Sequence, residues 1–115
     1  MVEQTVQLDD VFHALASGAR RQILGRLAQG DLTVGELAKP LAMSFAAASK
    51  HIKVLERVGL VQQTIEGRRH ICRLQPVPLA SASAWLRFYE RYWEERLDAL
   101  ETYLQTDSSS EREDQ

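Results

Sequence analysis

A short amphipathic helix, a glycine and a basic hairpin follow one another directly within residues 44–71. The helix is predicted over 44–58, because apolar side chains recur there at spacings of four and three residues and would share one face. These side chains are Ala48, Ile52 and Leu55. The opposite face keeps small, polar and basic residues, so only one side of this helix is suited to a protein core.

Gly59 ends the helix, and two predicted strands follow, one over 60–65 and one over 68–74. Glu66-Gly67 is the expected turn between them. A helix followed at once by a hairpin is typical of a winged helix-turn-helix, in which the helix enters the DNA major groove and the hairpin, or wing, lies beside it. This segment therefore predicts a DNA-binding regulator.

Helical spacing and capping residues predict four further helices. Ser17 and Ser44 are suited to cap the helices that follow them, and Thr33 with Glu36 has the form of a capping box. The four helices are expected over 8–16, 18–28, a short stretch after Thr33, and 79–104. The predicted fold class is mainly α with a small β-hairpin, in the order α-α-α-α-β-β-α.

The length of 115 residues is enough for one domain with a modest core, and such a chain often completes its buried surface by pairing with a second copy. We expect a flexible N-terminus over 1–7, a DNA-binding and dimerisation domain over 8–104, and a disordered tail over 105–115. The tail is acidic and serine-rich, and it has no apolar residue.

Several classes of protein do not fit the composition. No run of about 18 apolar residues is present and the N-terminus does not have the form of a signal peptide, so we expect a cytoplasmic protein without a membrane segment. The single cysteine, Cys72, allows no internal disulfide or cysteine-rich metal site. Three dispersed histidines, with no glycine-rich phosphate loop or nucleophile motif, predict neither an enzyme nor a bound cofactor.

The charge of the chain is unevenly distributed. The net charge is −2, but residues 40–74 contain six basic and two acidic side chains, whereas residues 75–115 contain four basic and nine acidic ones. Phosphate binding requires a local positive surface rather than a positive chain. The positive charge lies in the predicted helix and hairpin, where double-stranded DNA would bind.

The candidate DNA-binding residues lie in the first turns of the helix over 44–58 and in the wing over 66–69. Small side chains let the helix approach the groove, serine and lysine reach bases or phosphates, and arginine reaches phosphate or a narrow minor groove. These residues are Ser44, Phe45, Ala47, Ser49, Lys50, His51, Lys53, Arg68 and Arg69.

Other roles remain open for some basic and polar side chains. His51 would contact DNA or pack at the helix edge, and Lys53 would contact phosphate or only solvent. Arg20 and Arg21 stand at a helix N-terminus, which disfavours cations, so a nearby phosphate or a salt bridge to Asp9 or Asp10 is expected. Cys72 has basic neighbours that would suit a redox sensor, but strand alternation favours its burial.

The last helix carries six of the eight aromatic residues, arranged in two stripes. One stripe is sufficient for the domain's own core, so the other predicts a homodimer interface. Aromatic side chains here would also suit a hydrophobic ligand pocket. The residues assigned to the interface are Trp85, Leu86, Tyr89, Trp93, Leu97 and Leu100.

Five motifs in order closely resemble the ArsR/SmtB family of bacterial transcriptional repressors. They are Ser17-Gly18-Ala19-Arg20-Arg21-Gln22-Ile23-Leu24, Leu32-Thr33-Val34-Gly35-Glu36-Leu37-Ala38, Ser49-Lys50-His51-Ile52, Leu55-Glu56-Arg57-Val58-Gly59-Leu60-Val61 and Glu66-Gly67-Arg68-Arg69. The resemblance covers residues 8–104. It implies a homodimer that binds an inverted-repeat operator, represses its own or a neighbouring operon and releases DNA on sensing a signal.

The chain differs from the metal-sensing members of the family that it resembles. The stretch after Thr33 has no cysteine, and the last helix has no histidine, so the thiolate and imidazole ligands of those sites are absent. No metal is therefore expected, and a small-molecule effector is left unidentified. The competing function is a winged-helix module that binds protein and not DNA; the basic residues on the helix and wing argue against it.

Overall fold

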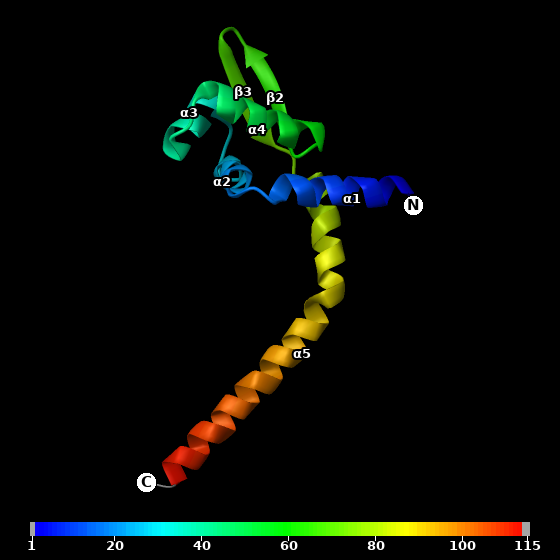
Figure 1. Ribbon diagram of the computed structural model, residues 1–115, viewed down its shortest axis with the longest axis vertical. Coiled ribbons are helices and arrows are strands. Elements are labelled where there is room, and N and C mark those ends of the chain that lie inside the picture. Colours follow the sequence, from blue (N-terminus) through cyan, green and yellow to red (C-terminus); the bar gives the residue numbers. More distant parts are fainter. Residues whose placement is uncertain (1, 114–115) are drawn as a thin grey trace. The chain divides into compact units, whose positions relative to one another are not determined.

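The computed structural model describes the backbone of residues 2–113 and the side chains of residues 7–107. The chain forms two compact units, residues 1–82 and residues 83–115. The first unit contains all the elements before the long last helix (Figure 1). The winged helix-turn-helix predicted from the sequence is confirmed, with one strand more than expected.

Four α-helices precede the hairpin. They are α1 (Val2–Leu15), α2 (Gly18–Leu27), α3 (Val34–Ala38) and α4 (Phe45–Arg57), and a short 3-10 turn, η1 (Lys39–Leu41), continues α3. The three predicted caps are present: Ser17 accepts from the Arg20 N–H, Ser44 accepts from the Ala47 N–H, and Thr33 forms a capping box with Glu36. These bonds fix where α2, α3 and α4 begin.

The turn between η1 and α4 uses a left-handed residue. Ala42 has a φ of 52°, and its N–H donates to the Lys39 carbonyl at 3.2 Å. The next N–H, of Met43, donates to the Ala38 carbonyl at 3.4 Å. The chain therefore closes the helical segment 34–41 and turns sharply before Ser44 starts α4.

The core of the first unit lies between the helices and the sheet. The predicted stripe of α4 is confirmed, because Ala48, Ile52 and Leu55 are fully buried, while Val58 is only half-buried. Cys72 is also fully buried, as strand alternation predicted. The remaining buried residues are Val11, Ala14, Ile23, Leu24, Leu27, Val34, Leu37, Ala38, Leu60, Val61 and Ala82.

The sheet has three antiparallel strands in the order β1-β3-β2. The hairpin consists of β2 (Val61–Glu66) and β3 (Arg69–Leu74), with Glu66 opposite Arg69. The predicted turn was wrong by one residue: Gly67-Arg68 forms the loop, and Gly67 has a φ of 62°. Strand β1 (Leu32–Thr33), which pairs with β3, was not predicted because two residues are too few to show alternation.

Arg20 and Arg21 have a role that the sequence analysis missed. In the described residues neither forms an ion pair with Asp9 or Asp10. Instead, Arg20 donates from Nε to the Ala14 carbonyl at 2.6 Å, and Arg21 donates from Nη1 to the Leu15 carbonyl at 2.7 Å. The carboxyl end of α1 carries partial negative charge, so it offsets the unfavourable position of both cations at the start of α2.

The last helix, α5 (Val77–Glu113), is longer than predicted at both ends. Its first turns belong to the first unit, where Leu79 and Ala82 join the core. Helix α1 likewise begins at Val2 rather than residue 8, so helical backbone covers much of the two segments expected to be irregular. Side chains at 1–6 and 108–115 lie outside the described residues, and the flexibility expected for both ends stays a prediction.

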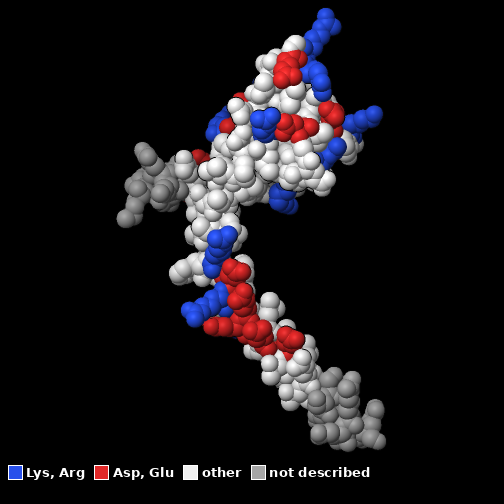
Figure 2. Space-filling model, turned by 180° about the vertical axis from the view of Figure 1, so that it is seen from behind, with Lys and Arg blue, Asp and Glu red and all other residues white. Residues whose placement is uncertain are grey.

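The second unit is the remainder of α5, and its apolar side chains are exposed. All six residues assigned to a dimer interface are between 39% and 63% exposed. Aromatic rings also lie against one another along the helix, with the centroids of Trp85 and Tyr89 5.0 Å apart and an angle of 55° between the planes. Asp and Glu side chains form a continuous run along another part of the helix surface (Figure 2). The unit therefore presents large apolar side chains alongside charged ones.

Candidate nucleic-acid interface

The predicted DNA-contacting side chains lie in the first turns of α4 and on the wing, and none of them is fully buried. Six of the nine candidates are exposed and three are half-buried. The exposed ones are Ser44, Phe45, Lys50, Lys53, Arg68 and Arg69; the half-buried ones are Ala47, Ser49 and His51. Because Ala48 and Ile52 anchor the opposite face of the helix in the core, this outer face has a fixed orientation.

The N-terminal end of α4 lies beside the wing. The ring of Phe45 meets the ring of His70 edge-on, with centroids 6.3 Å apart and an angle of 77° between the planes. His70 also accepts a hydrogen bond at Nδ1 from Gln63 Nε2 across the hairpin, at 3.0 Å. The hairpin is thereby linked to the helix, and the two basic segments that were predicted from separate motifs lie close together.

His70 and Gln63 were missed as site residues. A signal was present, because His70 lies two residues before the buried Cys72 and strand alternation places both on the same face of β3. That face turns toward the helices rather than toward solvent. The two residues support the wing and are not themselves among its exposed basic groups.

A shallow groove runs between the start of α3, the start of α4 and the wing. Its volume is about 310 Å³, and it is lined by Thr33, Val34, Gly35, Glu36, Phe45, Arg68, Arg69 and His70. Glu36 accepts from the Thr33 N–H at 3.1 Å and from the Thr33 hydroxyl at 2.9 Å. These bonds lower the pKa of the Glu36 carboxyl, and the charges of Arg69 and Arg26 lower it further. The groove therefore contains one fixed negative charge beside the wing arginines.

Part of the positive charge of this unit is already paired with an acidic side chain. Arg73, on β3, donates from Nε and Nη2 to one oxygen of Asp31, at 3.1 and 3.0 Å. Both partners are exposed, so the pair adds little to stability but occupies the guanidinium. No described residue forms an ion pair with the four exposed cations of α4 and the wing, which are Lys50, Lys53, Arg68 and Arg69. Lys and Arg side chains project from this unit (Figure 2).

Cys72 lies beneath the hairpin and does not belong to the exposed surface. Burial, with a smaller contribution from the charge of Glu56, raises the pKa of its thiol to about 11. A neutral, buried thiol is a poor nucleophile and a poor metal ligand. Among the described residues no group of three or more His, Cys, Asp and Glu side chains is placed to hold a metal ion.

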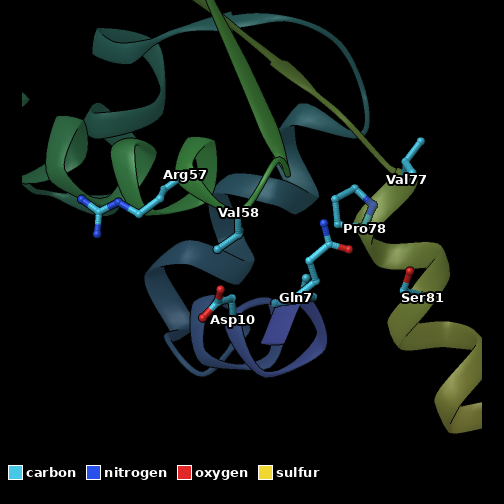
Figure 3. Close-up of a pocket in the computed structure, with 8 residues that line it drawn as sticks. Gln7, Asp10, Arg57, Val58, Val77, Pro78 and Ser81 are labelled. Carbon is cyan, nitrogen blue, oxygen red and sulfur yellow. The ribbon is translucent and has the colours of Figure 1, made fainter. Parts of the chain in front are cut away.

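A second cavity lies on the opposite end of α4, within the first unit. It has a volume of about 200 Å³ between α1, the carboxyl end of α4 and the start of α5, and Gln7 points from α1 toward Pro78 (Figure 3). The other lining residues are Asp10, Val11, Arg57, Val58, Val77 and Ser81. This volume is below the range of about 300–1,000 Å³ of most ligand pockets.

None of the helices in the described part of the chain is long and apolar enough to cross a bilayer.

The chain is similar to known regulators over the elements that build this surface. A family model described as a helix-turn-helix domain matches residues 15–64. The HTH-type transcriptional regulator Rv2034 of Mycobacterium tuberculosis (strain ATCC 25618 / H37Rv) is 44% identical over 85 residues, which are 74% of this chain and 77% of that protein.

Solved structures give the same result for the fold. The crystal structure of an ArsR family transcriptional regulator, RHA00566, has a TM-score of 0.71 and 40% identity, and the match covers 78% of this chain and 93% of that one. A homodimeric winged helix-turn-helix DNA-binding domain, fragment 1–100 of Mb0332 from Mycobacterium bovis, has a TM-score of 0.60 and 31% identity, covering 78% and 81%. Both matches extend well beyond the helix-turn-helix itself.

Proposed function

Because the chain belongs to the ArsR/SmtB family of winged helix-turn-helix transcriptional regulators, we propose that it binds an inverted-repeat DNA operator as a homodimer. In this proposal α4 enters the major groove and the wing lies on flanking DNA. Occupying an operator would block transcription of its own or a neighbouring operon, so the protein acts as a repressor. In this proposal the protein binds DNA and catalyses no reaction. It does so in the cytoplasm, where bacterial DNA is found.

The observation that carries this proposal is the exposed outer face of α4 beside the wing. Lys50 and Lys53 on α4 and Arg68 and Arg69 on the wing are all exposed, and the Phe45–His70 contact holds the two elements together. Phosphate contacts fix the position of a protein on DNA, and side chains in the first turns of the helix read base edges. A protein-binding module would not need four cations on these two elements that form no ion pair with a described residue.

The homodimer is supported by the apolar side chains of α5. Trp85, Leu86, Tyr89 and Trp93 are each at least 39% exposed in a single chain, and a monomer that exposed them in solution would tend to associate. The Mycobacterium bovis domain, which matches 78% of this chain, is homodimeric. Two copies related by a twofold axis would present two α4 helices to two half-sites, which explains the expected inverted repeat.

DNA sites selected from a random-sequence library test the operator. The selected site and a scrambled duplex are then compared by fluorescence anisotropy over a salt series. We expect the selected sites to contain an inverted repeat and to bind at least about 10³-fold more tightly than the scrambled duplex. Equal affinity for both duplexes would favour the protein-binding module instead.

Sedimentation equilibrium tests the dimer independently of DNA. The wild-type protein should have twice the chain mass of 13.0 kDa at micromolar concentration. Trp93→Glu places a charge among the exposed apolar residues, so it should give monomer or aggregate and weaken operator binding. Trp85→Glu and Tyr89→Glu, made in parallel, identify which side of α5 is buried. A wild-type mass of 13.0 kDa would contradict the dimer.

A further inference from the structure

Arg20 connects the end of α1 to the outer face of α4. Its Nε donates to the Ala14 carbonyl at 2.6 Å and its Nη2 to the His13 carbonyl at 3.2 Å. Both carbonyls belong to the carboxyl end of α1. The third nitrogen, Nη1, lies 3.4 Å from Nδ1 of His51 on α4. One guanidinium thus holds three groups from two helices.

The contact with Arg20 determines which nitrogen of His51 carries the proton. A guanidinium has only N–H donors and no acceptor, and it keeps its charge in proteins. The Nδ1 atom of His51 must therefore be the acceptor and carry no proton. In a neutral imidazole the proton then lies on Nε2, so His51 presents an N–H donor on its other side.

The Nε2 atom of His51 is available for an external partner. The described residues provide it with no hydrogen bond, and none of their buried side-chain nitrogen or oxygen atoms lacks a partner. An Nε2 atom without a partner must therefore be reached by solvent. His51 follows Lys50 directly, among the candidate DNA-binding residues of α4.

We propose that Arg20 is a positioning residue for DNA binding, because it fixes the tautomer and orientation of His51 so that the Nε2–H donates to an acceptor on DNA. This inference rests on the proposed function. Pre-orienting a donor removes the need to select one ring orientation and one tautomer from several when DNA binds. The acceptor is a phosphate oxygen or a base atom such as guanine O6 or N7.

The tautomer is measured first, in the full-length protein without DNA. Nitrogen-15 NMR at a pH where the imidazole is neutral should show the proton of His51 on Nε2. Arg20→Met should give a mixture of both tautomers. Arg21→Met is the matched control, since Arg21 contacts the same end of α1, through the Leu15 carbonyl, and has no hydrogen bond to His51. A wild-type proton on Nδ1 would by itself reject the proposal, whether or not the variants fold.

Binding to the selected operator is measured next. Arg20→Met should weaken affinity about 4- to 16-fold, because two to four ring states of His51 then share the population in each of two half-sites, while Arg21→Met should leave affinity within about twofold. His51→Gln keeps an amide donor near the position of Nε2 without depending on Arg20. Adding Arg20→Met to His51→Gln should therefore cause no further loss. Equal losses in both His51 backgrounds would show that Arg20 acts only through stability.

Comparing the selected operator with the scrambled duplex shows whether the acceptor for His51 is a base atom or a phosphate oxygen. A loss confined to the selected site identifies a base atom, and an equal loss on scrambled DNA identifies a phosphate oxygen. If the wild-type protein binds no DNA, the proposed function fails; the NMR result still decides whether Arg20 fixes the tautomer of His51.

Discussion

Removing a wing arginine should reduce the salt dependence of DNA binding by an amount that follows from the structure. Arg68 and Arg69 lie at the tip of the β2–β3 hairpin, are exposed, and form no ion pair with a described residue. In a dimer each substitution removes two cations. Since each phosphate contact contributes about 0.9 to the slope of log K against log[salt], one substitution should make the slope less steep by about 1.8.

The starting slope follows from the same side chains. Each subunit offers five exposed basic residues on α4 and the wing: Lys50, Lys53, Arg57, Arg68 and Arg69. If half to four-fifths of the ten in a dimer meet phosphate, the wild-type slope is about −4.5 to −7. Affinity would then fall about 500- to 16,000-fold between 50 and 200 mM salt. For Arg69→Ala the fall should be about 12-fold smaller.

The measurement is fluorescence anisotropy on one operator duplex over at least five salt concentrations. The control is the double variant Asp31→Ala/Arg73→Ala, which removes a cation from the same hairpin that is already held by an acid. Its slope should match the wild type. A wing variant with an unchanged slope, or a control that changes as much as the wing variant, would refute the contact between wing and phosphate.

Three further predictions concern α4 and the core. Lys50→Ala should weaken operator binding by about 1–3 kcal/mol and relax base preference, which anisotropy on duplexes with altered bases would detect; an unchanged preference would remove Lys50 from the base-reading set. Ser44→Ala should lower the free energy of unfolding by about 0.5–2 kcal/mol in urea, whereas Ser49→Ala, which removes no cap, should change it far less. The Cys72 pKa of about 11 lies above the ordinary value of 9.0, so the contribution of this thiol to stability should be constant below pH 9 and be lost as the pH rises through 9 to 11, by up to about 2.7 kcal/mol in total, and Cys72→Ala should remove this component.

Local sequence patterns were sufficient to predict the α-helices and the hairpin of the first unit. The stripe through Ile52 and Leu55, the caps at Ser17 and Ser44, and the burial of Cys72 depend on neighbours within one helix or strand, and all were confirmed. Such features follow from periodicity and from single hydrogen bonds.

Features that depend on contacts between elements could not be predicted in the same way. Strand β1 forms because Leu32 and Thr33 pair with Cys72 and Ile71 of β3, which lie 40 and 38 positions further along the chain. The link from Arg20 to His51 joins residues 31 positions apart, and the position of Arg20 at a helix N-terminus suggested an acid or phosphate as its partner instead. The contact of the candidate residues with DNA, and of α5 with a second copy, involves molecules outside the chain and stays a prediction.

The left-handed Ala42 has a consequence for the mobility of the chain where it enters α4. An alanine with a φ of 52° carries a backbone strain of about 1 kcal/mol, which Ala42→Gly would relieve. Glycine would also widen the unfolded ensemble, at a cost of about 0.4–1 kcal/mol, so the two effects nearly cancel. The backbone of the turn at Ala42, before α4, can therefore become more or less mobile with almost no change in melting temperature. A change at this position would alter the mobility of the chain where it enters α4, whose orientation is fixed by Ala48 and Ile52, without being detected by a screen for melting temperature.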